Sequence, residues 1–143
     1  MATSHRSPVT NGMKNHKDLE VWKEAVEFAV SCYDITKAFP QVEQFGLASQ
    51  MRRAAISIAS NIAEGAARTS NKEFIQFLYI SLGSASELDT QIEIARKIGL
   101  GNISEIEALQ LKVNGISRML QGLIRSVKTK SRKANHQSLI TND

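Results

Sequence analysis

Residues 104–127 read SEIEALQLKVNGISRMLQGLIRSV, the most regular apolar pattern in the chain. The apolar residues follow one another at alternating steps of three and four: Ile106, Leu109, Val113, Ile116, Leu120, Leu123 and Val127. Such steps place side chains on one face of a helix, and three heptads of them indicate lengthwise packing against near-parallel helices. Ser104 and Glu107 have the spacing of a capping box, which predicts that the helix begins there.

Two glycines lie beside this apolar stripe. Gly115 and Gly122 are seven residues apart and therefore share one face of the helix. Each interior glycine costs a helix about 1 kcal/mol relative to alanine. The pair therefore suggests close approach of another helix, with a chance spacing as the alternative, and we take both glycines as candidate oligomer contacts.

Two helices are predicted before this one. The first covers about 47–66, with apolar positions Leu47, Met51, Ala55, Ile58 and Ile62. The second runs to about Ile98, with core positions Phe74, Leu78, Ser81, Ala85, Leu88, Ile92 and Ala95. Ser70 or Asn71 suits its N-terminal cap, and Gly99 suits a left-handed C-terminal cap.

A further helix begins near Asp18 and ends at Phe39-Pro40, because the residue before proline avoids the helical region. It carries two apolar series, one at Leu19, Trp22, Val26, Ala29 and Tyr33 and one at Val21, Ala25, Phe28, Cys32, Ile35 and Phe39. Either the helix is deeply buried, or one stripe faces a second subunit. For the second alternative we take Val21 and Phe28 as candidate oligomer contacts.

These four helices and their short connectors predict an all-α, antiparallel up-down-up-down four-helix bundle over residues 17–127. Residues 1–16 are polar and contain Pro8 and Gly12, so we expect a disordered leader, or a start at Met13 in place of Met1. After Val127 we expect a frayed helix end and a basic disordered tail over residues 128–143.

The charge is unevenly distributed over the 143 residues, whose formal net charge is +4. Residues 18–107 hold eight basic and thirteen acidic side chains, a net −5, whereas residues 108–143 hold seven basic and one acidic. The candidate nucleic-acid-binding residues are Arg118, Arg125, Lys128, Lys130, Arg132 and Lys133. Cations here are also typical of a solvated helix end that complements the helix dipole.

The chain offers little for catalysis. His5, His16 and His136 lie outside the predicted helices, and the single cysteine, Cys32, lies in an apolar stripe. No cluster has metal-ligand spacing, and no phosphate-binding loop is present, so we expect neither an enzyme nor a bound cofactor or metal. No run reaches the roughly 18 apolar residues of a membrane span, and no secretory signal follows Met1, so we expect a cytoplasmic protein.

Residues 16–100 resemble the four-helix-bundle proteins encoded in intervening sequences of bacterial large-subunit ribosomal RNA genes. The matching residues are Asp18-Leu19-Glu20-Val21-Trp22, Phe39-Pro40, Phe45-Gly46-Leu47, Gln50-Met51-Arg52-Arg53-Ala54-Ala55, Ser57-Ile58-Ala59-Ser60-Asn61-Ile62-Ala63-Glu64-Gly65, Glu73-Phe74, Phe77-Leu78 and Gly83-Ser84 with Glu87-Leu88. Ala59 departs from the family, which usually has proline there. The resemblance implies a left-handed bundle, a homo-oligomeric ring that is typically a pentamer, and no established catalytic activity. A distantly similar bundle, the accessory protein of diversity-generating retroelements, is thought to bind nucleic acid.

Small polar residues on the 47–66 helix form a second stripe. If this helix and the next form an antiparallel hairpin, Arg52 and Arg53 come within a turn of Glu87. We favour a structural polar network of Arg52, Arg53, Ser57, Ser60, Asn61, Glu64, Ser84 and Glu87, because buried polar groups need partners. The alternative is that these groups form a ligand or nucleic-acid surface.

Three functions are therefore open. The first is a non-catalytic ring that binds RNA or DNA through phosphate contacts of its basic C-terminal segments. The second is a protein-interaction scaffold without a nucleic-acid role. The third, a small-molecule-binding bundle, is supported only by the polar stripe. We expect no base stacking, because the aromatic residues with helical spacing are expected in the core.

Overall fold

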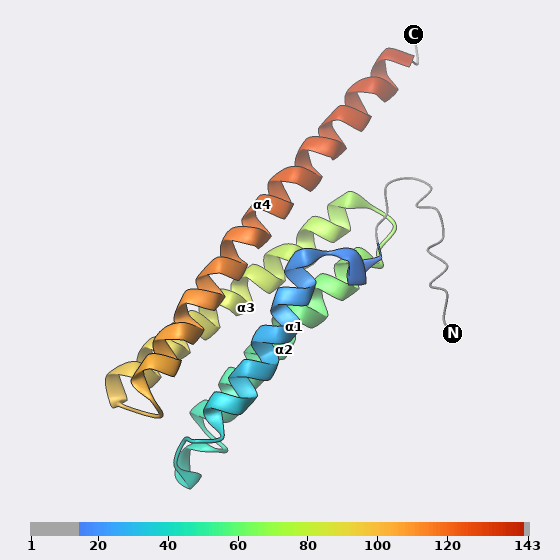
Figure 1. Ribbon diagram of the computed structural model, residues 1–143. Coiled ribbons are helices and arrows are strands. Elements are labelled where there is room, and N and C mark those ends of the chain that lie inside the picture. Colours follow the sequence, from blue (N-terminus) through green and yellow to red (C-terminus); the bar gives the residue numbers. More distant parts are fainter. Residues whose placement is uncertain (1–14, 142–143) are drawn as a thin grey trace, which may run out of the picture.

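The computed structural model describes residues 15–141 and has four α-helices, with no strand in that range (Figure 1). The elements are η2 (His16–Asp18), α1 (Glu20–Thr36), η3 (Gln41–Glu43), α2 (Leu47–Ala66), α3 (Asn71–Ile98) and α4 (Ile103–Thr141). Each helix packs against its neighbours in sequence, and α4 closes the bundle against α1. The predicted all-α four-helix bundle is confirmed.

The ends of α2 and α3 follow the sequence prediction. α2 begins at Leu47 and ends at Ala66, as its apolar period predicts. The Ser70 hydroxyl accepts a hydrogen bond from the Glu73 backbone N–H at 3.2 Å, which caps α3. Gly99 ends α3 with φ 87°, in the left-handed region that favours glycine.

The predicted Ser104–Glu107 capping box is wrong. The cap of α4 is Asn102, whose Oδ1 accepts hydrogen bonds from the Glu105 backbone N–H at 3.1 Å and from the Ser104 hydroxyl at 2.7 Å. Asn102 precedes the first helical residue, and its short amide reaches the third N–H of the first turn. Ser104 is already within the helix.

Two other boundaries differ from the prediction. α1 ends at Thr36 rather than Phe39, because the Gln44 side-chain amide donates to the carbonyls of both residues, at 3.1 and 2.8 Å. α4 continues past Val127 to Thr141, where we expected a tail without structure. The added segment has no glycine or proline to end the helix, and it holds three Lys and one Arg, which favour helix. Of the predicted leader, residues 1–14 lie outside the described range.

The core is built from one apolar face of each helix. Its largest fully buried side chains include Phe28, Met51, Ile58, Leu78, Leu88, Ile106, Leu109 and Leu120. The α2–α3 contact is the most extensive, and the α1–α4 contact is the least extensive of the four contacts between neighbouring helices. Leu109, Val113, Ile116 and Leu120 are buried as their spacing predicts.

Close approach of α2 and α3 depends on Gly65, in the last turn of α2. It is buried, and a Cβ added there would lie 2.7 Å from Phe77 Cβ and 3.3 Å from the Phe74 carbonyl oxygen. One turn further along α3, the buried Ser81 hydroxyl donates to the Ile58 carbonyl at 2.8 Å. The small residues of α2 therefore allow α3 to pack close to its backbone.

Candidate nucleic-acid interface

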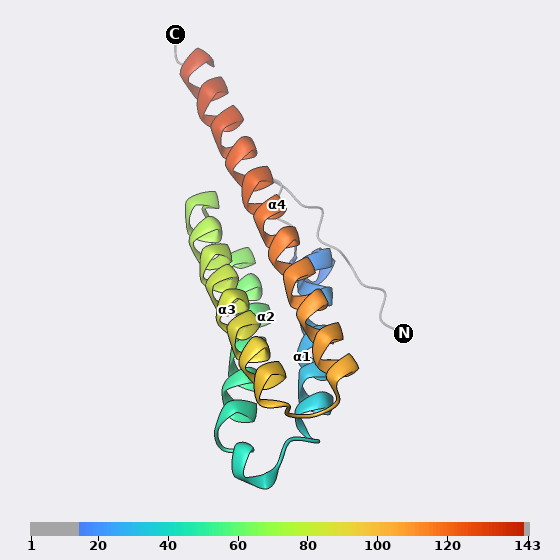
Figure 2. The ribbon, with the colours of Figure 1, turned by 90° about the vertical axis from the view of Figure 1, so that its left-hand side faces the viewer.

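The basic part of α4 projects from the bundle. Figures 1 and 2 show α4 continuing beyond the turn that joins α2 and α3, with no other helix beside its last turns. Residues 132–137 are all exposed. From Ala108 to Thr141, α4 carries seven Lys and Arg residues and no Asp or Glu. We call residues 128–141 the α4 arm.

Three arginines form a row along α4. Arg118, Arg125 and Arg132 recur every seven residues, which separates them by about 10 Å along the helix axis. The guanidinium of Arg118 lies 3.9 Å from where a Cβ on Gly115 would be, and that of Arg125 lies 3.8 Å from the same point on Gly122. Each of these two arginines therefore folds back beside a glycine, at an exposed surface.

The remaining cations of the arm lie on different sides of α4. Lys130 lines a small cavity of about 70 Å³ with Arg68, Ser70 and Asn71 at the α2–α3 turn. Lys128 instead contacts α3, where its Nζ donates to the Tyr79 hydroxyl at 2.8 Å. Positive charge thus surrounds α4 where it leaves the bundle.

Tyr79 is the contact that the sequence missed. It lies outside the core series that the sequence predicts for α3, and 47% of the residue is exposed. Lys128 Nζ lies 2.8 Å from the Tyr79 oxygen and 5.2 Å from the ring centre, so the ammonium is near the hydroxyl end rather than above the face. No signal within α3 marks this residue, because only the position of α4 makes it part of a basic surface.

The predicted oligomer contacts fall in two different places. Val21 and Phe28 are only 4% and 2% exposed and form part of the core, so their side chains are not available to a second subunit. Gly115 and Gly122 have no atom of another helix within 4 Å of an added Cβ, so no helix of this chain packs closely on them. Their face remains open.

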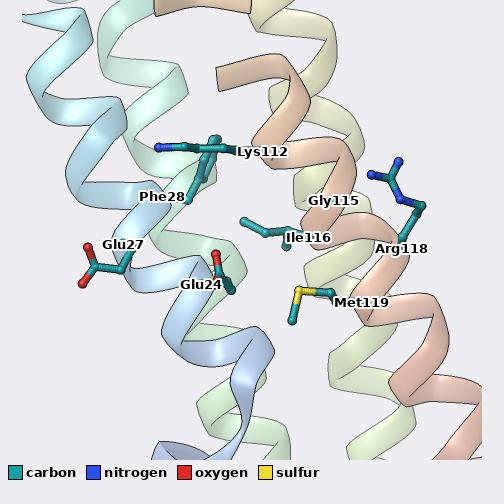
Figure 3. A pocket seen from close by; sticks show the side chains of 8 residues that line it. All are labelled: Glu24, Glu27, Phe28, Lys112, Gly115, Ile116, Arg118 and Met119. Atoms are coloured by element: carbon teal, nitrogen blue, oxygen red, sulfur yellow. The ribbon is translucent and has the colours of Figure 1, made fainter. Parts of the chain in front are cut away.

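A groove of about 500 Å³ lies between α1 and α4, where the bundle packs least extensively. Figure 3 shows Lys112, Ile116 and Met119 directed toward α1, whereas the side chain of Arg118, which also lines the groove, extends away from α1. Phe28 and Ile116 make the groove apolar at its base, and Glu24, Glu27 and Lys112 make its rim charged. Gly115 widens the groove because it has no side chain.

The predicted polar network on α2 forms only in part. Ser57 and Ser84 share a hydrogen bond of 2.8 Å between α2 and α3, and Asn61 donates to the Ser57 hydroxyl at 3.0 Å. Arg53 and Glu87 are both exposed and form no ion pair with each other within the described residues. The predicted pairing of Arg53 with Glu87 is therefore wrong. Of the other predicted members, Ser60 is exposed, and Glu64 pairs instead with Arg68 at 3.9 Å.

Arg52 points to α1 instead. Its Nε donates to the Thr36 hydroxyl at 2.9 Å, its Nη2 donates to Gln44 Oε1 at 3.2 Å, and its guanidinium lies 5.1 Å from the centre of the Tyr33 ring. Thr36 is fully buried, so this arginine holds the α1–α2 connector against both helices. The pattern of α2 and α3 does not indicate this contact, because Thr36 belongs to α1.

An apolar surface covers the junction of α1 and α2. Val30 and Ile56 are 55% and 45% exposed, and with Val26, Ala29, Tyr33 and Ala59 they line a depression of about 310 Å³. We call these six residues the α1–α2 apolar face. Three of its α1 residues, Val26, Ala29 and Tyr33, belong to one of the two apolar series predicted for this helix. The other series, which includes Val21, Ala25, Phe28 and Cys32, supplies the core.

Cys32 and Glu93 have shifted pKa values, each for a local reason. Burial raises the pKa of the Cys32 thiol to about 11, against a smaller opposing effect of Arg52, so the thiolate is disfavoured at neutral pH. Hydrogen bonding from Arg96 lowers the pKa of Glu93 to about 2, with a further contribution from Gln110. Within residues 15–141, no group of three His, Cys, Asp or Glu side chains could hold a metal ion, and no helix is long and apolar enough to cross a membrane.

Comparisons with known proteins give the relatives of the chain. The sequence profile described as 23S rRNA-intervening sequence protein matches residues 17–122. A solved structure, a protein of unknown function from the S23 ribosomal protein family of Bacteroides thetaiotaomicron VPI-5482, matches with a TM-score of 0.68 and 25% sequence identity. The match covers 73% of this chain and 95% of that chain. A comparison with curated proteins found no match.

Proposed function

The chain belongs to the 23S rRNA-intervening sequence protein family, and from this premise we propose that it is a non-catalytic protein that binds RNA or DNA. The phosphate backbone would contact the basic surface of α4, which includes Arg118, Arg125, Lys128, Lys130, Arg132 and Lys133. We further propose that the bundle assembles into a homo-oligomeric ring, expected to be a pentamer.

One observation carries the nucleic-acid proposal: α4 leaves the bundle as an exposed helix with seven cations and no anion after Glu107. A helix end that merely complements its dipole needs cations in the last turn only. Here the cations begin at Lys112, several turns earlier, and continue through the arm. Ring assembly would bring several arms to one polyanion, and weak phosphate contacts would then add.

The α4 arm is the part to remove in a first test. A chain that ends at Val127 keeps every described core residue and loses Lys128, Lys130, Arg132 and Lys133. Fluorescence anisotropy with labelled RNA and DNA should show affinity at low salt for the full chain and a loss of at least tenfold for the shortened one, since about four phosphate contacts disappear. Equal affinity of both chains contradicts the proposal.

Two unlike surfaces support ring closure. A ring needs a heterologous interface, in which one surface of each subunit contacts a different surface of the next. The α1–α2 apolar face supplies one such surface, and the open face with Gly115 and Gly122 supplies the other. Glycines there would let a neighbouring subunit approach the α4 backbone closely.

A single charge on the α1–α2 apolar face should disrupt this ring. Val30→Glu buries an unpaired carboxylate in the interface, so light scattering should show a lower mass than for the unmodified chain. Ile94→Glu, at an exposed apolar residue of α3 outside both proposed surfaces, is the matched control and should leave the mass unchanged. A monomeric mass for the unmodified chain would refute the ring.

The α1–α2 apolar face also favours a second function, a scaffold that binds a partner protein. In that case Val30→Glu would abolish capture of the partner without lowering the mass of the assembly. Removal of the α4 arm would leave capture intact. Loss of function on Val30→Glu would therefore support the scaffold, and loss of function on removal of the α4 arm would support nucleic-acid binding.

A further inference from the structure

The root of the α4 arm combines an exposed aromatic ring with several cations. Tyr79 from α3 is held by Lys128 through a hydrogen bond of 2.8 Å. Arg125 and Arg132 lie three residues before and four residues after Lys128, so the three cations share one side of α4. The ring therefore lies at the edge of this row of charges rather than apart from it.

The ring has room for a flat partner. About half of Tyr79 is exposed, and the Lys128 ammonium contacts its hydroxyl end, not its face. Next in the chain, Ile80 is also exposed, but successive helix residues point in different directions, so it lies off the face that carries Tyr79. Such an exposed ring next to ammonium and guanidinium groups has the components with which proteins bind single strands, a stacking ring and cations along the backbone.

We propose that Tyr79 and Lys128 form a nucleotide position for single-stranded nucleic acid. An unpaired base stacks on the Tyr79 ring, and its flanking phosphates contact Lys128 and the neighbouring arginines, Arg125 and Arg132. This rests on the proposed function of α4 and deepens it, because paired bases in a duplex offer phosphates but no free face to stack. The surface therefore selects single strands over duplex.

The test compares a labelled 15-nucleotide poly-uridine strand with a 15-base-pair RNA duplex, using the full chain. Tyr79→Ala should weaken single-strand binding by about five- to one-hundredfold, the size of one lost stacking contact, and leave duplex binding unchanged. Tyr79→Phe keeps the ring and should bind the single strand within about threefold of the unmodified chain, because only the hydroxyl contact is lost. Ile80→Ala is the control for loss of an exposed apolar side chain and should change neither affinity.

The outcomes separate this inference from the function on which it rests. If Lys130→Gln with Lys133→Gln weakens both probes while Tyr79→Ala changes neither, the stacking position is overturned and the role of α4 stands. Equal losses on both probes with Tyr79→Ala, together with a lowered melting temperature, also overturn it, because they indicate damage to the α3–α4 contact. If the unmodified chain binds neither probe, both proposals fall.

Discussion

Gly65→Ala is expected to destabilise the bundle by about 2 kcal/mol, although alanine is the better helix former by about 1 kcal/mol. The added methyl would lie 2.7 Å from Phe77 Cβ, 3.0 Å from Phe74 Cδ1 and 3.3 Å from the Phe74 carbonyl oxygen. The Cβ and the carbonyl belong to parts of α3 that cannot rotate away. The helices must therefore separate, and the contact they lose is the most extensive in the bundle.

Thermal unfolding followed by circular dichroism measures this effect, and a loss of 2 kcal/mol corresponds to a fall of about 5 to 15 °C in a domain of this size. Gly83→Ala is the matched control, because Gly83 is also inside a helix but has no atom within 4 Å of an added Cβ. That variant should be more stable by about 0.5 to 1 kcal/mol. Stabilisation by both substitutions would show that α2 and α3 do not approach as closely as described.

Replacement of the four arm cations by glutamine should reduce nucleic-acid affinity as strongly as removal of the arm. The variant Lys128→Gln, Lys130→Gln, Arg132→Gln and Lys133→Gln keeps the helix, because glutamine has a helix propensity close to that of lysine and arginine. If each cation contacts a phosphate, the slope of log affinity against log salt should fall in magnitude by about 3. Titrations at several salt concentrations measure this slope.

A control with the same net charge removes four lysines elsewhere. Lys23→Gln, Lys37→Gln, Lys72→Gln and Lys97→Gln changes the charge by the same amount, and these residues lie on or next to α1 and α3 rather than on α4. Its salt slope should stay close to that of the unmodified chain. If both variants lose affinity equally, binding follows net charge and α4 has no special part.

Local signals in the sequence were sufficient for most of the helices. The α2 limits and the Ser70 cap depend on a few adjacent residues, and both were predicted correctly. The Asn102 cap was missed because two overlapping cap signals compete within three residues. The end of α4 was missed because cations after Val127 were read as the end of a helix, although they also favour its continuation.

The candidate site depended more on tertiary contacts than on local pattern. The cations of α4 were visible in the sequence, but their position on a projecting helix was not. Arg52 lies on α2, and only the packing of α1 against α2 brings the Thr36 hydroxyl within reach of its guanidinium. Tyr79 and Lys128 are far apart in the chain and belong to different helices, so no periodic pattern of residues could indicate their contact.

The cations of the α4 arm repel one another, and a bound polyanion would remove this repulsion. Lys128 and Arg132 are four residues apart and Lys130 and Lys133 are three apart, so like charges are neighbours on the helix, and residues 132–137 are all exposed. Such pairs destabilise a helix by about 0.2 to 0.5 kcal/mol each, and phosphates between them replace repulsion with attraction. Nucleic acid would therefore act on this segment as a counterion that favours the helical state, so that occupancy and helix content rise together.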